Sequence, residues 1–323
     1  MLKTKKLITA LVTSLLLLFA ASPLAAAQAT GSGLSISPTL FELSIGPGQS
    51  KNITITLKNA TVGSVDAQGT VNDFVSDNST GNPKILTQPG ASSPNSIKNF
   101  VFQLSSLPLD PGQQKNVTVG LHIPDGTPPG AYWGIIRYKA VPVGANAPAP
   151  GQVALTASVG TVVLITVPGN LRQQISLSAV HIYRGAHDGT LFFTKPDKIG
   201  VEIRNFGNAF VQPFGTVEVQ NMFGKTVSNF QFNNPKQLGN VLPGSTRVFT
   251  NGFSGASQFG RYKATASVSY GSGSQVLTLT KTFWYVPAWL AIVVVLILLI
   301  LIFLSYRALR RYRHESRHWH RGR

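Results

Sequence analysis

Hydrophobic and polar residues alternate with a period of two through most of the chain, from Leu34 to Phe283. The alternation is clearest in NITITL (52–57), NFVFQL (99–104), NVTVGL (116–121) and KATASVSY (263–270). Successive side chains of a strand point to opposite faces of its sheet, so this pattern is typical of half-buried antiparallel strands. The runs are bounded by Gly, Pro, Asn and Asp, which favour turns. We therefore predict that this region is all-β.

A repeated pattern of turn residues divides the region into two similar units. LDPGQQKNVTV (109–119) and LPGSTRVFT (242–250) each place Pro-Gly ahead of a strand, and IGPGQSKNITI (45–55) adds a third Pro-Gly. Proline presets φ at the first central position of a type II turn, and glycine supplies the positive φ at the second. We predict type II turns at all three places, within two tandem immunoglobulin-like β-sandwich domains.

A tyrosine follows the next glycine in each unit, in GAY (130–132) and GRY (260–262). Sandwich domains place a tyrosine corner at the start of such a strand, where the ring is buried and the hydroxyl bonds to the backbone. We predict that Tyr132 and Tyr262 are structural tyrosine corners.

The boundary between the two units is expected near Pro168-Gly169-Asn170, where one apolar strand ends and a new alternating run begins. This gives a first sandwich over 30–169 and a second over 170–284. Gly144 to Gly151 is interpreted as a hairpin excursion within the first. The polar loop from Ser76 to Asn95 is either a binding loop or a plain surface loop.

The N-terminal residues 1–29 are predicted to be a secretory signal peptide. Three lysines precede an apolar run (7–21), and small residues follow in AAAQA (25–29). Cleavage is expected after Ala27 or Ala29. A retained membrane anchor is the alternative, but the apolar run is short for a transmembrane helix.

A second apolar segment, residues 285–306, is predicted to be a transmembrane helix. It carries no charge and no glycine, and it is long enough to cross a hydrocarbon core of about 30 Å. Aromatic residues, which favour the headgroup level, gather at its two ends. They are Trp284, Tyr285, Trp289 and Tyr306.

The tail, residues 307–323, is strongly basic, with Glu315 as its only acid. Because positive flanks stay on the cytoplasmic side, we predict a single-pass cell-membrane protein with an extracellular N-terminal ectodomain and a cytoplasmic tail. Tail arginines are expected to lie against anionic lipid. They include Arg307, Arg310, Arg311, Arg313 and Arg317. Three tail histidines are a weaker candidate for metal binding, since the neighbouring cations oppose it.

The formal net charge of +17 does not indicate a nucleic-acid partner, because the signal and the tail carry more than half of it and the remaining charges are scattered. The chain has no cysteine, which excludes thiol catalysis and Cys-ligated metal sites. No HExxH, GxSxG or phosphate-loop motif occurs. We predict a protein that is not an enzyme and has no metal or other cofactor. His187-Asp188-Gly189 is interpreted as a hairpin turn.

Three stretches resemble the WxL-interacting surface proteins of Gram-positive-type bacteria. They are SPTLFELSIGPGQSKNITITLKN (37–59), VGLHIPDGTPPGAYWGIIRY (119–138), and GRYKATASVSYG followed by TKTFWYV (280–286). The resemblance implies a first domain that binds peptidoglycan, a second that binds a host ligand, and association with WxL proteins. The opening of the first domain is equally similar to periplasmic pilus chaperones.

The leading functional hypothesis is therefore a non-enzymatic, membrane-anchored surface scaffold for adhesion, which engages cell-wall polymer such as peptidoglycan or other surface proteins. The alternative is a membrane-tethered, chaperone-like assembly factor that pairs an open strand edge with exported subunits. A wall-modifying enzyme is the third hypothesis. No residue pattern identifies the ligand-binding positions.

Overall fold

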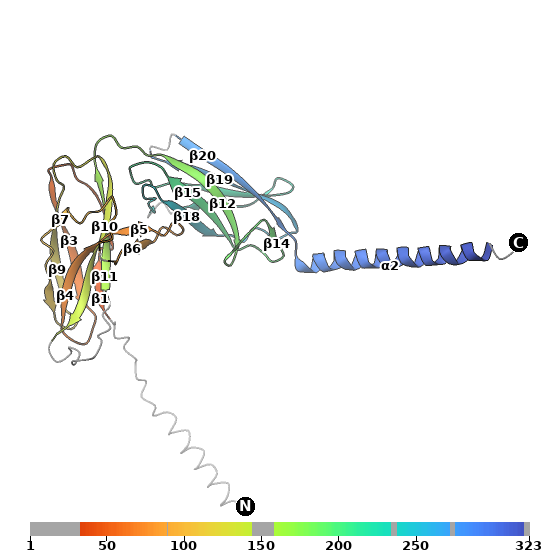
Figure 1. Cartoon of the computed structure of the whole chain (residues 1–323), viewed down its shortest axis with the longest axis horizontal. Helices are drawn as coiled ribbons and strands as arrows, with labels where there is room; N and C mark the ends of the chain where they lie inside the picture. The colour runs from red at the N-terminus through yellow and green to blue at the C-terminus, as the bar shows by residue number, and fades with distance from the viewer. Residues whose placement is uncertain (1–32, 89, 144–157, 234–237, 272–274, 320–323) are drawn as a thin grey trace, which may run out of the picture.

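The computed structural model describes residues 33–88, 90–143, 158–233, 238–271 and 275–319. It contains two β-sandwiches followed by one helix, as Figure 1 shows. The all-β prediction is confirmed. The predicted cleavage residues Ala27 and Ala29 and the excursion 144–151 lie outside the described residues.

The first sandwich has one four-stranded and one five-stranded sheet. The first sheet has the order β1-β3-β9-β7, formed by β1 (Leu34–Ser37), β3 (Ser50–Asn59), β9 (Gln114–His122) and β7 (Val101–Phe102). The second has the order β2-β11-β10-β4-β8, formed by β2 (Leu40–Ser44), β11 (Ser158–Val167), β10 (Gly130–Pro142), β4 (Val65–Asn72) and β8 (Leu107–Leu109). A hairpin of β5 (Phe74–Ser76) and β6 (Pro83–Ile85) forms a separate two-stranded sheet.

The second sandwich repeats this plan. One sheet has the order β13-β12-β15-β18, formed by β13 (His187–Asp188), β12 (Ile175–Arg184), β15 (Lys198–Asn205) and β18 (Thr246–Gly252). The other has the order β14-β20-β19-β16-β17, formed by β14 (Leu191–Phe192), β20 (Gln275–Tyr285), β19 (Gly260–Tyr270), β16 (Phe214–Asn221) and β17 (Thr226–Phe232). In both sandwiches an early segment crosses between the sheets, so that β2 lies parallel to β11 and β14 lies parallel to β20.

Each sandwich has a hydrophobic core of its own. One cluster of buried side chains lies entirely between Leu34 and Val167, and the other lies between Ile175 and Tyr285. The inward residues of the alternating runs supply both: Ile53, Ile55 and Leu57 of NITITL are at most 4% exposed. Burial of such side chains is the main force that holds a cysteine-free sandwich together.

The three Pro-Gly turns have the predicted form. Gly48, Gly112 and Gly244 have φ between 72° and 74°, the positive value that the second central position of a type II turn requires. The residue after each glycine donates its amide to the carbonyl three residues earlier, at 3.0–3.2 Å.

A buried asparagine holds two of these turns, and the sequence analysis did not identify it. Asn59 and Asn205 are fully buried at the ends of β3 and β15. The Asn59 amide donates to the carbonyls of Gly63 and Leu109, at 2.8 and 3.0 Å. The Asn205 amide donates in the same way to Ala209 and Val241, at 2.8 and 2.9 Å.

These asparagines also connect to the turns through the backbone. The amides of Gly112 and Gly244 donate to the carbonyls of Asn59 and Asn205, at 2.9 and 3.0 Å. Each asparagine therefore joins a strand end to a turn that lies far away in sequence. Two equivalent polar networks inside two separate cores indicate that the sandwiches share one structural plan.

One strand is much shorter than its pattern predicts. NFVFQL (99–104) alternates throughout, yet β7 contains only Val101 and Phe102. Gln103 has a φ of 57°, in the left-handed region that L-residues rarely adopt, and this ends the strand.

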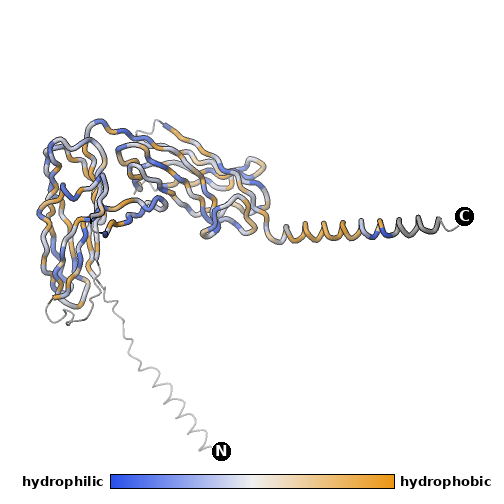
Figure 2. Tube along the Cα trace, in the orientation of Figure 1, coloured by the Kyte–Doolittle hydropathy of each residue, from blue (hydrophilic) through white to orange (hydrophobic). Residues whose placement is uncertain are grey.

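The C-terminal helix α2 (Ala288–Trp319) differs in its bounds from the predicted segment 285–306. Tyr285 still belongs to β20, where it pairs with Gly260, and the helix continues well beyond residue 306. The stretch Ala288–Arg310 has 23 residues; its most apolar 18-residue window has a mean hydropathy of 3.2, and none of that window is buried. Figure 2 shows the apolar part of α2 next to the second sandwich and the polar part beyond it. By length and composition this helix can cross a membrane.

Candidate functional site

The two sandwiches contact each other through an apolar cluster. Trp133 of β10 lies at its centre, 5% exposed, and its ring packs edge-to-face on Phe210 with centroids 6.1 Å apart. The indole nitrogen donates to the carbonyl of Phe74 at 2.9 Å, which satisfies its one polar group. The other buried members are Phe74, Ala131, Ile135, Leu164 and Leu242. Because Phe210 and Leu242 belong to the second sandwich, this cluster fixes one sandwich against the other.

Asn208 ties the connecting segment to both sandwiches. Its carbonyl accepts from the amide of Ala131 at 2.8 Å, and its side-chain oxygen accepts from the amide of Arg172 at 2.7 Å. The side-chain amide donates to Asn170 at 3.2 Å and to Pro129 at 3.4 Å. The short connection thus has few degrees of freedom.

The tip of the β5–β6 hairpin reaches the second sandwich, as Figure 1 shows. The amide of Val248 in β18 donates to the carbonyl of Ser79 at 2.6 Å, and that of Thr246 donates to the Asn78 side chain at 3.2 Å. We call residues 77–82 the strap tip. The front half of the polar loop 76–95 therefore contacts the other sandwich instead of standing free.

Asp77 shapes the strap tip. Its carboxylate accepts from the Thr80 hydroxyl at 2.5 Å and from the amides of Ser79 and Gly81 at 2.9 and 2.8 Å. The Thr80 hydrogen bond, with help from these amides, lowers the pKa of Asp77 to about 2 against a smaller effect of burial. The carboxylate is thus charged at ordinary pH and holds Ser79 where Val248 meets it.

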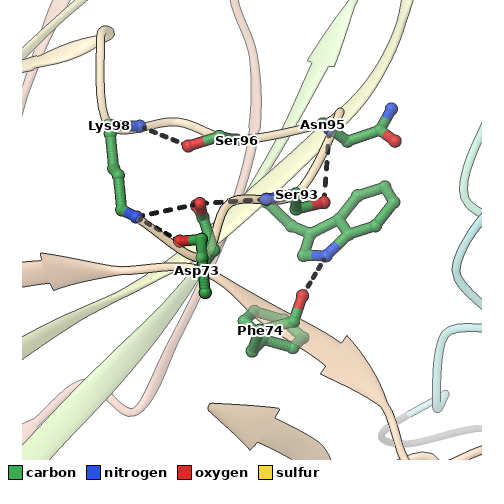
Figure 3. Close-up of polar contacts among 8 residues, drawn as sticks. Asp73, Phe74, Ser93, Asn95, Ser96 and Lys98 are labelled. Carbon is green, nitrogen blue, oxygen red and sulfur yellow. Dashed lines mark hydrogen bonds and ion pairs between the residues drawn. The ribbon is translucent and has the colours of Figure 1, made fainter. Parts of the chain in front are cut away.

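The rear half of the loop is fixed from inside the first sandwich, as Figure 3 shows. Asp73 is fully buried, and its Oδ2 lies 3.1 Å from the ammonium of Lys98 and accepts from the amide of Ser93 at 3.1 Å. Asn95 donates its side-chain amide to Ala131 at 2.8 Å. This network anchors the base of the hairpin to the strand that carries Trp133.

Arg247 lies beneath the strap tip on the second sandwich. Its guanidinium stacks over Phe249, 4.8 Å from the ring centroid, and donates to the carbonyl of Asn240 at 2.9 Å. Burial lowers its pKa, and the charge of Asp77 acts in the opposite direction. A Cβ on Gly81 would lie 2.4 Å from the Arg247 side chain, so only glycine allows this approach.

A cleft of about 460 Å³ lies between the sandwiches beside these contacts. One wall comes from β2 and β11 and the other from the segment 210–214 with Leu238 and Asn240. Glu42 projects from β2 and accepts hydrogen bonds from the amides of Gln212, at 3.3 Å to each oxygen, and of Asn240. Apolar residues complete the lining; they include Leu43, Leu164, Phe210 and Phe214.

A second hollow of about 400 Å³ adjoins the cleft on the sheet that contains β16, β17 and β19. It shares Phe214 and Leu238 with the cleft. Its lining is mostly apolar, with Phe232, Val276 and serine and threonine side chains between them. The two hollows together offer an extended surface with both hydrogen-bonding and apolar groups.

The cleft also borders an open sheet edge. β2 is the terminal strand of its sheet and pairs on one side with β11. In the part of the chain that the structure describes, no strand pairs with its other side. Exposed strand edges present unpaired N–H and C=O groups that can accept an added strand.

The predicted tyrosine corners lie in equivalent places in the two sandwiches. The Tyr132 hydroxyl donates to the carbonyl of Pro128 at 3.0 Å, and the Tyr262 hydroxyl donates to that of Gln258 at 2.6 Å. Tyr262 is 2% exposed and stacks on Phe283, whereas Tyr132 is half-buried against Phe100. The stabilising role of these hydroxyls stays a prediction.

The predicted tail residues all fall on α2. Arg307 and Arg310 are exposed, and Arg311, Arg313 and Arg317 follow on the same helix. The role of these arginines in orienting the chain stays a prediction.

One cluster of ionisable groups lies away from the cleft. The ring of His181 bonds to Asp188 at 2.7 Å and to Glu202 at 2.9 Å. Burial lowers the pKa of His181, but the hydrogen bonds and charges of the two carboxylates prevail and raise it. The predicted turn at 187–189 is wrong: His187 and Asp188 form β13, and the chain reverses at Gly185, with φ 61°. Among the described residues, no three His, Asp or Glu side chains form a group that could hold a metal ion.

Comparisons with known proteins concern the fold. No family model matches the chain, and no curated protein matches it. Among solved structures, the class 5 fimbriae chaperone CfaA is 12% identical, with a TM-score of 0.38 over 77% of this chain and 99% of that one. The Escherichia coli chaperone DraB is 15% identical, with a TM-score of 0.33 over 78% and 96%. The Pseudomonas aeruginosa chaperone CupB2 is 12% identical, with a TM-score of 0.31 over 76% and 99%.

Proposed function

We propose that this chain is a non-enzymatic, membrane-anchored binding protein of the cell surface, whose two sandwiches hold a partner in the cleft between them. The observation that carries the proposal is the fixed cleft. The Trp133 cluster, Asn208 and the strap tip all hold the two walls in place. A preformed site loses little conformational freedom on binding, which favours affinity.

The lining of the cleft suits a ligand with many hydrogen-bonding groups. Glu42, Gln212 and Asn240 supply a carboxylate and two amides, and Phe210 and Phe214 supply aromatic faces. Such sites fix orientation with a few polar groups and gain affinity from apolar contact. A wall polymer such as peptidoglycan, which the family resemblance implies, has sugar rings and peptide groups that fit both kinds of contact.

The helix that follows the second sandwich determines on which side of the membrane the cleft lies. Helix α2 follows β20 almost directly and can cross a membrane once, with the sandwiches outside and the basic tail inside. In that orientation the cleft stands at the outer surface, where wall polymer and other surface proteins are available.

Binding of the full chain, in detergent micelles, to purified peptidoglycan tests the proposal. Phe214→Glu places a charge between the two hollows, at a side chain that is 40% exposed, and should reduce the bound fraction at least several-fold. Phe102→Glu changes an equally exposed phenylalanine (40%) on β7, away from the cleft, and should bind like the unmodified chain. Equal binding by both variants would contradict the cleft as the site.

A second candidate function is a membrane-tethered, chaperone-like assembly factor. The open edge of β2 beside the cleft favours it, because an extended segment of an exported subunit could pair there. A proline at Glu42 removes a backbone donor from the open side of this strand. The exposed β2 edge is the element to test: Glu42→Pro should abolish subunit capture, whereas Glu42→Gln should weaken only the binding of wall polymer.

A further inference from the structure

The second sandwich has an exposed apolar end at the point where helix α2 begins. Phe223, at the turn between β16 and β17, is 83% exposed, and its neighbour Met222 is 42% exposed. Other large apolar side chains that are 45–51% exposed come from three further segments of the same end. They are Leu191 and Phe193, Phe259, and Trp284.

Strand pairing places these residues at one level. Trp284 pairs with Leu191 on one side and with Arg261 on the other. Phe259 directly precedes Gly260, whose partner is Tyr285. The Met222 side chain lies 3.1 Å from the position that a Cβ on Gly260 would take. Neighbouring strands are about 4.8 Å apart, so the set forms one patch across the end of the sheet. We call it the apolar end.

The same end is basic. Lys195, Lys225 and Arg261 are exposed there, and no ion pair involves them within the described segments. Its two acids are engaged locally: Asp188 bonds to His181, and Asp197 bonds to Arg184 at 3.2 Å. Exposed aromatic residues beside unpaired cations fit a surface that is both apolar and anionic.

The connection to α2 keeps this end close to the helix. Only Val286 and Pro287 separate β20 from α2, and the amide of Val286 donates to the carbonyl of Phe192 at 2.8 Å. The sandwich therefore cannot move far from the first turn of the helix. Figure 1 shows β14 and the end of β20 beside the start of α2.

We propose that the apolar end rests in the headgroup layer of the membrane that α2 crosses, with Phe223, Met222 and Phe259 inserted and the three cations against anionic lipid. The inference rests on the proposed membrane anchoring. Amphipathic and aromatic side chains favour this layer, and large exposed apolar patches mark such contacts. The sandwich then has a fixed height and tilt, and it presents the cleft away from the membrane.

Environment-sensitive labels on the full chain in nanodiscs of mixed neutral and anionic phospholipid test this proposal. The chain lacks cysteine, so Phe223→Cys introduces a unique labelling site. Two controls have comparable exposure: Val276→Cys (62% exposed) lies at the opposite end of β20, and Val62→Cys (79% exposed) lies on the first sandwich.

A label at 223 should emit at shorter wavelength and higher intensity than either control, and nitroxide-bearing lipids should quench it while aqueous iodide should not. Lys225→Glu combined with Arg261→Glu should reverse part of this change. A label at 223 that iodide quenches as readily as one at Val62, in a chain that co-elutes with the nanodisc, would overturn the proposal and leave the anchoring intact. A chain that elutes apart from the nanodisc would overturn both.

Discussion

The two sandwiches share their internal framework and differ in their surfaces. Each has a crossing segment, a Pro-Gly turn held by a buried asparagine, and a tyrosine whose hydroxyl bonds four residues back. Among the residues that the structure describes, the first sandwich alone sends a hairpin onto its neighbour, and the second alone ends in an exposed apolar patch beside the helix. We infer that the features common to both sandwiches stabilise the fold, whereas the features found in one sandwich set its position and its contacts.

We expect the largest change in the free energy of unfolding at the residue that follows the tyrosine of the first sandwich, and almost none at the equivalent residue of the second. Trp133 follows Tyr132 and is buried between the sandwiches, whereas Lys263 follows Tyr262 and is exposed. Trp133→Ala should lower the free energy of unfolding by about 3–5 kcal/mol, because it leaves a cavity in the contact. Lys263→Ala should change it by less than about 0.5 kcal/mol. Urea unfolding of the full chain in detergent measures both; similar values would contradict the assignment of the contact.

The second largest loss of stability is expected at the two buried asparagines, and it should be similar in both sandwiches. Asn59→Ala and Asn205→Ala each remove two donated hydrogen bonds at a fully buried strand end, which should cost about 2–4 kcal/mol. Asn116 serves as the control, since like Asn59 it begins an N-x-T triplet, but its side chain accepts a hydrogen bond from Thr56 at the surface. Asn116→Ala should stay within about 0.5 kcal/mol in the same unfolding experiment. A marked difference between the first two variants would show that the framework is not equivalent.

The two tyrosine hydroxyls make equivalent hydrogen bonds, but the two side chains differ in burial. Tyr262→Phe should cost about 1–2 kcal/mol, since its hydroxyl bonds at 2.6 Å in a side chain that is 2% exposed. Tyr132→Phe should cost less, about 0.5 kcal/mol, because water can replace the longer bond of a half-buried side chain. Melting temperatures of the full chain would show the order, and the reverse order would argue against the role of burial.

The smallest expected effect is a pH-dependent contribution of His181, in the second sandwich, to the free energy of unfolding. Since the two carboxylates raise the folded-state pKa of His181, its charged form stabilises the fold below the unfolded pKa of about 6.5. This contribution is lost as the pH rises through the folded pKa. It should be below about 1 kcal/mol because the groups are partly exposed. His181→Gln should remove this part of the pH dependence of unfolding, and an unchanged profile would contradict it.

The sequence predicted what depends on neighbours along the chain. Alternation indicated the strands, and Pro-Gly indicated the turns, because both follow from local backbone geometry. Alternation also overextended the strand at 99–104, since it carries no information about the left-handed backbone at Gln103.

What the sequence could not predict depends on distant segments. Asn59 bonds to Leu109, and Asn205 bonds to Val241, so neither asparagine differs locally from a strand-end residue. The cleft needs β2 from one sandwich and 210–214 from the other. In each unit an asparagine at a strand end is followed later in the chain by a Pro-Gly turn, LDPGQ after Asn59 and LPGS after Asn205. This repetition was the one sequence signal for the buried networks.

Hydrogen exchange of the full chain in nanodiscs shows whether the partner binds in the cleft. Soluble peptidoglycan fragments should slow amide exchange in β2 and in the segments 210–214 and 238–240, while β7 and β8 at the far edges keep their rates. Protection on other surfaces, with the rates of these segments unchanged, would contradict binding in the cleft.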